Sequence, residues 1–256
     1  MSSNRPLILV TNDDGISAKG LFSLVEVMKP LGEVVVVAPD SPQSGMGHAI
    51  TINHPLRLEK SHLFEGIVAY SCSGTPVDCV KLGIYEVLHQ KPDLVVSGIN
   101  HGANTSTNVL YSGTMSAAIE GAMEWLPSIG FSLCNFDSDA DFSLAKIVAA
   151  KIAEQVLENG MPKGICLNVN VPGLSEKEFS GMKVCRQAHA YWEDSFDKRL
   201  DQFKRPYYWL TGDFTDQDKS ENTDLYWIER GYASIVPTQF DLTAYEAIKE
   251  LENWSL

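Results

Sequence analysis

Short runs of β-branched and apolar residues alternate with segments of helical periodicity, and this alternation constrains the fold of the chain most strongly. Pro6 to Thr11 reads PLILVT, and Glu33 to Pro39 reads EVVVVAP. Runs that are apolar at consecutive positions are typical of strands buried on both faces of a parallel sheet. Between them, Gly20 to Leu31 carries apolar residues at helical spacing. These segments predict a strand, helix, strand unit.

The same alternation continues through about two thirds of the chain. A helix is expected after Thr75, because Thr75 can cap it, Pro76 suits its first turn and Asp78 follows three residues after the cap. Further strands are expected over 93–97, 129–134 and 165–171, and further helices over 114–126 and 142–157. The pattern predicts an α/β fold with a mostly parallel sheet and helices on both faces.

The character of the chain changes from about Met182. Aromatic residues gather between Tyr191 and Tyr232, interleaved with acids and bases. Within this segment, Tyr207 to Leu210 and Leu225 to Glu229 are expected to be strands of a hairpin. A hairpin is marginal in water unless it packs on another surface, and both a partner subunit and the parent domain remain open as that surface.

The predicted organisation follows from this change. It is an α/β core over 1–181, an extended arm for oligomerisation over 182–235, and a C-terminal segment with a helix near 243–254 over 236–256.

Charge and composition narrow the classes of partner. The formal net charge of −13 would repel polymeric nucleic acid and anionic lipid. The longest apolar runs fall far short of the roughly 18 residues that a membrane helix needs. Asn12, Asp13 and Asp14 interrupt the first apolar run, so it is not a secretory signal, and the five cysteines form no CxxC pair. We expect a cytoplasmic protein.

Acidic residues follow the first strand directly, at Asp13 and Asp14. Adjacent carboxylates raise each other's pKa unless they share a cation, and carboxylate oxygens suit Mg²⁺, Mn²⁺ or Ca²⁺. Asp14-Gly15 is also a common turn sequence, so a simple turn is the alternative reading of this motif alone.

Two further loops are expected at the same edge of the sheet, because parallel strands all end there. The loop over 39–48 brings neutral oxygen donors and two glycines, and the loop over 97–105 is rich in glycine and amides. The second loop leads to Tyr111–Thr114 at a predicted helix start, where hydroxyls and free backbone amides favour an anion. Together these loops predict a site for a metal ion and a phosphate group.

Four ordered segments resemble the SurE family, the stationary-phase survival proteins, which are metal-dependent 5′-nucleotidases. The segments are LILVTNDDGISAKGL (7–21), VVAPDSPQSGMGHAIT (36–51), VVSGINHGANT (95–105) and YSGTMSAAIEG (111–121). The resemblance implies a Rossmann-like three-layer α/β/α core and a C-terminal hairpin arm used in homodimer or homotetramer assembly. It also implies hydrolysis of nucleoside 5′-monophosphates to nucleoside and phosphate, with 3′-nucleotides and short polyphosphate as further possible substrates.

The resemblance also assigns site residues. It implies one divalent cation per subunit, Mg²⁺ or Mn²⁺, with the ligands Asp13, Asp14, Ser44 and Asn100. The residues that it places against the phosphate are Asn104, Ser112, Gly113 and Thr114.

Asp13 and Asp14 are the expected catalytic residues. Asp13 would orient or deprotonate a water molecule that attacks phosphorus. The alternative is that Asp13 itself attacks and forms an aspartyl-phosphate; the adjacent pair, without a spaced DxD motif, favours water. A non-hydrolytic nucleotide sensor is the second functional hypothesis, and the paired carboxylates favour the enzyme.

Overall fold

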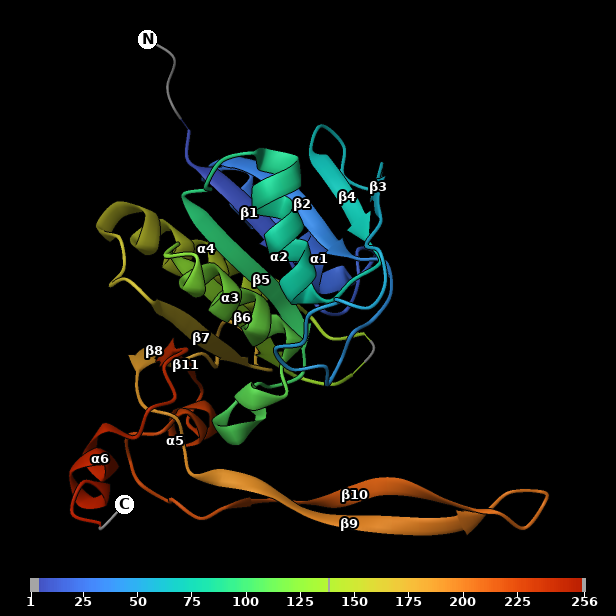
Figure 1. The fold of residues 1–256 in the computed structure, drawn as a ribbon. Coiled ribbons are helices and arrows are strands. Elements are labelled where there is room, and N and C mark those ends of the chain that lie inside the picture. The colour runs from blue at the N-terminus through green and yellow to red at the C-terminus, as the bar shows by residue number, and fades with distance from the viewer. Residues whose placement is uncertain (1–4, 138, 255–256) are drawn as a thin grey trace.

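The computed structural model describes residues 5–137 and 139–254, and its centre is a nine-stranded sheet (Figure 1). The strand order is β3-β4-β2-β1-β5-β6-β7-β11-β8. The strands are β1 Leu7–Thr11, β2 Glu33–Pro39, β3 Leu58–Lys60, β4 Val68–Cys72, β5 Leu94–His101, β6 Ser128–Cys134, β7 Ile165–Pro172, β8 Gly181–Val184 and β11 Tyr232–Gln239. The six strands from β4 to β7 are parallel, which confirms the predicted sheet.

Helices cover both faces of the sheet. Alternate residues of β1 face opposite layers: Ile8 belongs to the core cluster beneath α1 (Lys19–Met28) and α4 (Ser143–Asn159). Leu9 belongs to the cluster beneath α2 (Pro76–Leu82) and α3 (Gly113–Met123). The predicted three-layer α/β/α architecture is therefore confirmed.

Local sequence explains where α2 begins. The Thr75 hydroxyl accepts the backbone N–H of Asp78, and the Asp78 carboxylate accepts the backbone N–H of Thr75. This reciprocal pair satisfies two backbone donors that the helix leaves unpaired. The helix then continues into η1 (Gly83–Leu88), a short π-helical segment.

The order of the strands determines where a ligand can bind. β1 lies between β2 and β5, so the chain moves outward in opposite directions from β1. In open parallel sheets, the crevice at the carboxyl ends of strands on either side of such a reversal is the usual binding site. The loops after β1 and β5 meet at this point.

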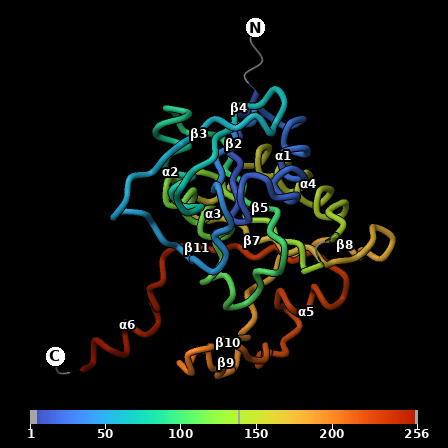
Figure 2. Tube along the Cα trace, turned by 90° about the vertical axis from the view of Figure 1, so that its right-hand side faces the viewer, coloured from blue at the N-terminus to red at the C-terminus, as the bar shows by residue number. Residues whose placement is uncertain are grey.

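Strands β9 (Ala190–Leu200) and β10 (Pro206–Asp216) form an antiparallel hairpin that projects from the body (Figure 1) and is seen end-on, below the body, in Figure 2. The projecting part is shorter than the segment 182–235, because β8 and β11 at its two ends join the main sheet. The C-terminal helix α6 spans Tyr245–Leu251. Among the described residues, no helix has the length and apolar character needed to cross a membrane.

The strand expected over Leu225–Glu229 is wrong, because these residues belong to the helix α5 (Asp224–Glu229). Thr223 caps α5 by accepting the backbone N–H of Tyr226 at 3.2 Å. The aromatic composition suggested a strand, but the cap and the packing of α5 on β11 decide the local structure.

Asp224 connects α5, the base of the arm and the short helix η2 (Ser106–Leu110). Its fully buried carboxylate accepts the backbone N–H groups of Ser106 at 2.8 Å, Ala188 at 2.9 Å and Leu225 at 2.9 Å. Burial raises the pKa of this carboxyl, and the three hydrogen bonds oppose that effect. One side chain therefore holds the arm base against the body.

Replacing Asp224 by Ala should leave three backbone donors without their acceptor. We expect the free energy of unfolding to fall by about 1–3 kcal/mol, measured by urea denaturation. Glu229→Gln, an exposed change on the same helix, should stay within about 0.5 kcal/mol of the wild type. Equal unfolding midpoints for Asp224→Ala and the wild type would contradict this role.

Candidate active site

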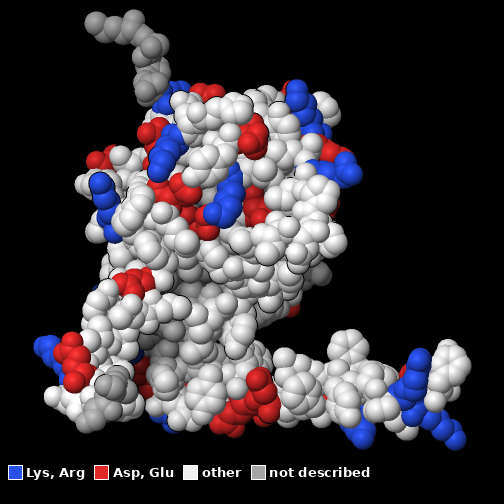
Figure 3. Space-filling view, in the orientation of Figure 1, with Lys and Arg blue, Asp and Glu red and all other residues white. Residues whose placement is uncertain are grey.

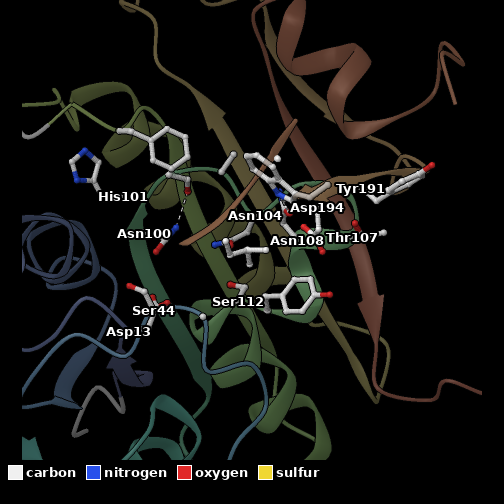
Figure 4. Close-up of a pocket in the computed structure, with 18 of the residues that line it drawn as sticks. Asp13, Ser44, Asn100, His101, Asn104, Thr107, Asn108, Ser112, Tyr191 and Asp194 are labelled. Carbon is white, nitrogen blue, oxygen red and sulfur yellow. Dashed lines mark hydrogen bonds between the residues drawn. The ribbon is translucent and has the colours of Figure 1, made fainter. Parts of the chain in front are cut away.

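A cavity of about 900 Å³ opens at the carboxyl ends of β1 and β5. Figure 3 shows the molecule hollowed between the body and the arm, with few charged side chains around the hollow. Lining residues come from the loops after β1, β2 and β5, from η2, from the residue that caps α3, and from the arm. Figure 4 shows ten of these residues with labels.

Asp13 and Asp14 both line the cavity, but their environments differ. Asp13 is buried and its Oδ1 accepts a hydrogen bond from the Thr114 hydroxyl. Burial raises the pKa of Asp13 to about 6, with a further contribution from the charge of Asp14. Asp14 is half-buried, accepts the backbone N–H of His101 at 3.2 Å, and also has a raised pKa because of burial. A cation close to both carboxylates would lower their pKa values and favour the ionised form of each.

Ser44 and Asn100 add neutral oxygens to the same cavity. The Asn100 Nδ2 donates to the carbonyl of Gly102 at 2.7 Å, which leaves Oδ1 free as a ligand (Figure 4). Ser44 lies on the exposed loop after β2. The backbone N–H of the preceding Gln43 donates to the carbonyl of Asp13 at 2.7 Å, so this loop is attached to the acidic pair.

The chemistry of this donor set fits a hard divalent cation. It combines two carboxylates with one hydroxyl and one amide oxygen, which are ligands that Mg²⁺ and Mn²⁺ accept. Among the described residues, no group of three His, Cys, Asp or Glu side chains could hold a metal. Any cation bound here therefore depends on the neutral oxygens as well as on the carboxylates.

The N-terminus of α3 lies against Asp13. Ser112 caps this helix: its Oγ accepts the backbone N–H of Met115 at 3.0 Å, and its own proton stays available to the cavity. A Cβ at Gly113 would lie 2.7 Å from the Cβ of Asp13, so only glycine permits this approach. Thr114 is fully buried and does not line the cavity, because its hydroxyl donates to Asp13 instead.

Asn104 lines the cavity from within a buried amide network. Its backbone N–H donates to Asn170 Oδ1 at 2.7 Å, and its carbonyl accepts from Asn168 Nδ2 at 2.8 Å. The Asn104 side-chain amide contacts Ser132 Oγ at 2.8 Å. Sequence analysis assigned no role to Ser132, Asn168 or Asn170; the alternating amides on β7 are the only local sign of this network.

A second buried polar group holds the loop that carries Ser44. Glu120 of α3 accepts from His48 Nε2 at 2.9 Å and from the Lys81 ammonium. Burial alone would raise the pKa of Glu120, but these two hydrogen bonds bring the pKa below its usual range. The sequence analysis missed this pairing because the three residues lie far apart in the chain.

The arm also lines the cavity, which sequence analysis did not predict. Tyr191, Trp192 and Asp194 of β9 contribute, and so do Leu210 to Gly212 of β10. The indole Nε1 of Trp192 donates to Asn108 Oδ1 at 3.0 Å, so the arm is attached to η2 beside the cavity.

Comparisons with known proteins point to one family. The family described as "Survival protein SurE" matches residues 8–194. A protein of Cytophaga hutchinsonii named 5′-nucleotidase SurE is 60% identical, with 97% of this chain and 96% of that protein covered. A protein of the same name from Christiangramia forsetii is 58% identical over 100% of this chain and 99% of its own length.

A solved structure extends the agreement to the fold. The SurE protein from Aquifex aeolicus superposes with a TM-score of 0.84 at 39% identity, covering 96% of this chain and 98% of that one. The match of sequence and the match of structure both extend over nearly the whole chain. The chain therefore belongs to the SurE family.

Proposed function

We propose that the chain is a metal-dependent 5′-nucleotidase that hydrolyses nucleoside 5′-monophosphates to nucleoside and phosphate. The observation that carries this proposal is the placement of Asp13 and Asp14 at one cavity with the N-terminus of α3. The relatives named 5′-nucleotidase SurE support the same activity. A protein that only binds nucleotides, without hydrolysis, would not need one buried and one half-buried carboxylate beside the position of the phosphate.

The proposed ligands of one divalent cation, Mg²⁺ or Mn²⁺, are Asp13, Asp14, Ser44 and Asn100. When bound, such a cation supplies a positive charge that offsets the negative charge developing on the phosphoryl oxygens and lowers the pKa of a bound water. Thr114 and the Gly102 carbonyl orient two of these ligands through hydrogen bonds.

The phosphate group would bind where Ser112 and Asn104 face the cavity. The Ser112 hydroxyl can donate, and the backbone N–H groups at the start of the eleven-residue helix α3 favour an anion. Asn104 Nδ2 donates one N–H to Ser132 Oγ and keeps its second N–H for the phosphate. Thr114 would act through Asp13 and not by direct contact with phosphate.

Asp13 would orient the attacking water and accept its proton. The hydrogen bond from Thr114 occupies Oδ1, which leaves Oδ2 for this role.

We also propose that the distal arm assembles the protein into a homodimer or homotetramer. Large apolar side chains are exposed there, including Phe196, Phe203 and Trp209, which are each at least 60% exposed. Exposed apolar patches on a projecting element favour binding to a protein partner. We place the protein in the cytoplasm, where the free cysteines would remain reduced.

Purified protein should release phosphate from nucleoside 5′-monophosphates with Mg²⁺ or Mn²⁺, and chelation should stop the release. Asp14→Asn should lower kcat/KM by about 100-fold or more, because it removes a charged ligand. Asp40→Asn, an exposed change just after β2, is the matched control and should retain activity. The same assay with 3′-nucleotides and short polyphosphate defines the substrate range. Undiminished turnover in chelator would contradict the proposal.

The effect of Asp13→Asn on stability should depend on metal. Without metal the variant should be more stable than the wild type, and with metal it should be less stable. Folding raises the pKa of Asp13 from 3.8 to about 6, so the stability of metal-free protein falls as pH rises through that interval. At about pH 7.5 without metal, the free energy of unfolding of the variant should exceed that of the wild type by at most about 3 kcal/mol. The variant should therefore unfold at a higher temperature. Mg²⁺ should raise the Tm of the wild type and have little effect on the variant. Equal Mg²⁺ effects on both proteins would count against Asp13 as a ligand.

Shortening the arm should reduce the mass in solution. Phe196 and Leu210 are paired across the hairpin, so an Asn-Gly turn can join them in place of residues 197–209. Light scattering should give an oligomer for the full chain and a monomer for the shortened chain. A monomeric full chain, or an unchanged oligomer after shortening, would exclude the arm as the assembly element.

A further inference from the structure

We propose that the arm forms the nucleoside subsite of its own chain, with the Trp192 ring as the surface on which the base stacks. This inference rests on the proposed function and extends it to substrate selection. The arm then has a role at the base of the hairpin that differs from assembly at its tip.

The size and chemistry of the cavity support a second subsite. A volume of about 900 Å³ is at the upper end of ligand pockets, and a cation with one phosphate group fills only a small part of it. The end near Asp13 is built from oxygen donors, whereas the arm adds two large apolar side chains, Trp192 and Leu210, beside the acidic Asp194. A nucleoside 5′-monophosphate has the same division, with a charged group at one end and a flat aromatic base at the other.

The register of the hairpin places the relevant side chains on one face. Trp192 pairs with Phe214, Asp194 with Gly212, and Phe196 with Leu210. Alternate residues of a strand point to the same side, so Trp192, Asp194 and the partners Phe214, Gly212 and Leu210 share a face. The rings of Trp192 and Phe214 lie 5.5 Å apart at their centroids.

Gly212 has no side chain, so it leaves a recess on this face between the side chains of Phe214 and Leu210 on β10. A Cβ at this position would lie 2.5 Å from the Glu193 carbonyl oxygen, so a larger residue would distort the hairpin. The recess lies diagonally across the hairpin from Trp192. The Trp192 side chain itself lines the cavity. Trp192 itself remains 48% exposed, which leaves ring surface for a ligand.

Hydrogen bonds hold this wall in position before any ligand binds. Trp192 donates to Asn108 of η2 at 3.0 Å (Asn108 and Asp194 are labelled in Figure 4). The Ser106 hydroxyl contacts the carbonyl of Ala190 at 2.7 Å, and Thr107 donates to the same carbonyl at 2.6 Å. A preorganised aromatic surface loses little side-chain entropy on binding.

The test separates the base from the phosphate. Trp192→Ala should weaken the binding of adenosine, measured by calorimetry, and lower kcat/KM for AMP, each by about tenfold, which corresponds to about 1.4 kcal/mol. Ribose 5-phosphate has no base, so its kcat/KM should change by less than about twofold. Trp192→Phe should retain most of the binding, because it keeps an aromatic face.

Trp209→Ala is the matched control. It removes the same side chain from the other face of the hairpin, outside the cavity, and should leave adenosine binding unchanged. Unchanged adenosine binding in Trp192→Ala, or equal losses with AMP and ribose 5-phosphate, would overturn the inference. A fall in mass accompanied by equal losses would assign Trp192 to assembly instead. If the wild type hydrolysed neither ester, the proposed function would fail, whereas adenosine binding would still decide the subsite.

Discussion

Two neighbouring carboxylates at the end of a central buried strand are the constraint on which the site depends. Asp13 is almost fully buried, and its pKa is raised because water is excluded from it. Such a group destabilises the fold when ionised unless something compensates. Thr114 and the glycine at the start of α3 bring a donor and a helix N-terminus against it, and the neighbouring oxygens of Ser44 and Asn100 are the further ligands proposed for a cation.

The surrounding layers explain why these donors are well placed. Glu120 holds the loop after β2 through His48, and Asn168 and Asn170 hold the loop after β5 through the backbone of Asn104. Glu120, Asn168 and Asn170 are buried and hydrogen-bonded, and satisfied buried polar groups of this kind make the attached loops rigid. The loops that carry the proposed ligands are therefore positioned by the faces of α3 and β7.

Features encoded locally could be predicted from the sequence. The apolar runs of β1 and β2 and the capping box at Thr75 depend on adjacent residues, and the structure has them. The orientation of Thr114 toward Asp13 and the pairing of Trp192 with Asn108 depend on residues about 100 and 84 positions apart. No spacing in the sequence reports such contacts. The helix at Asp224 shows the same limit, because aromatic composition there was outweighed by a cap and tertiary packing.

The overall charge would give the proposed cation a role in recognition as well as in chemistry. A chain with a net charge of −13 repels a phosphate dianion at a distance, and Asp13 and Asp14 add to that repulsion inside the cavity. The helix N-terminus and the neutral side chains offer only partial charges. Binding of cation and phosphate should consequently be coupled, because each reduces the electrostatic cost of the other. Stacking on the Trp192 ring at the far end does not add to this cost, since stacking does not depend on the sign of the protein's charge.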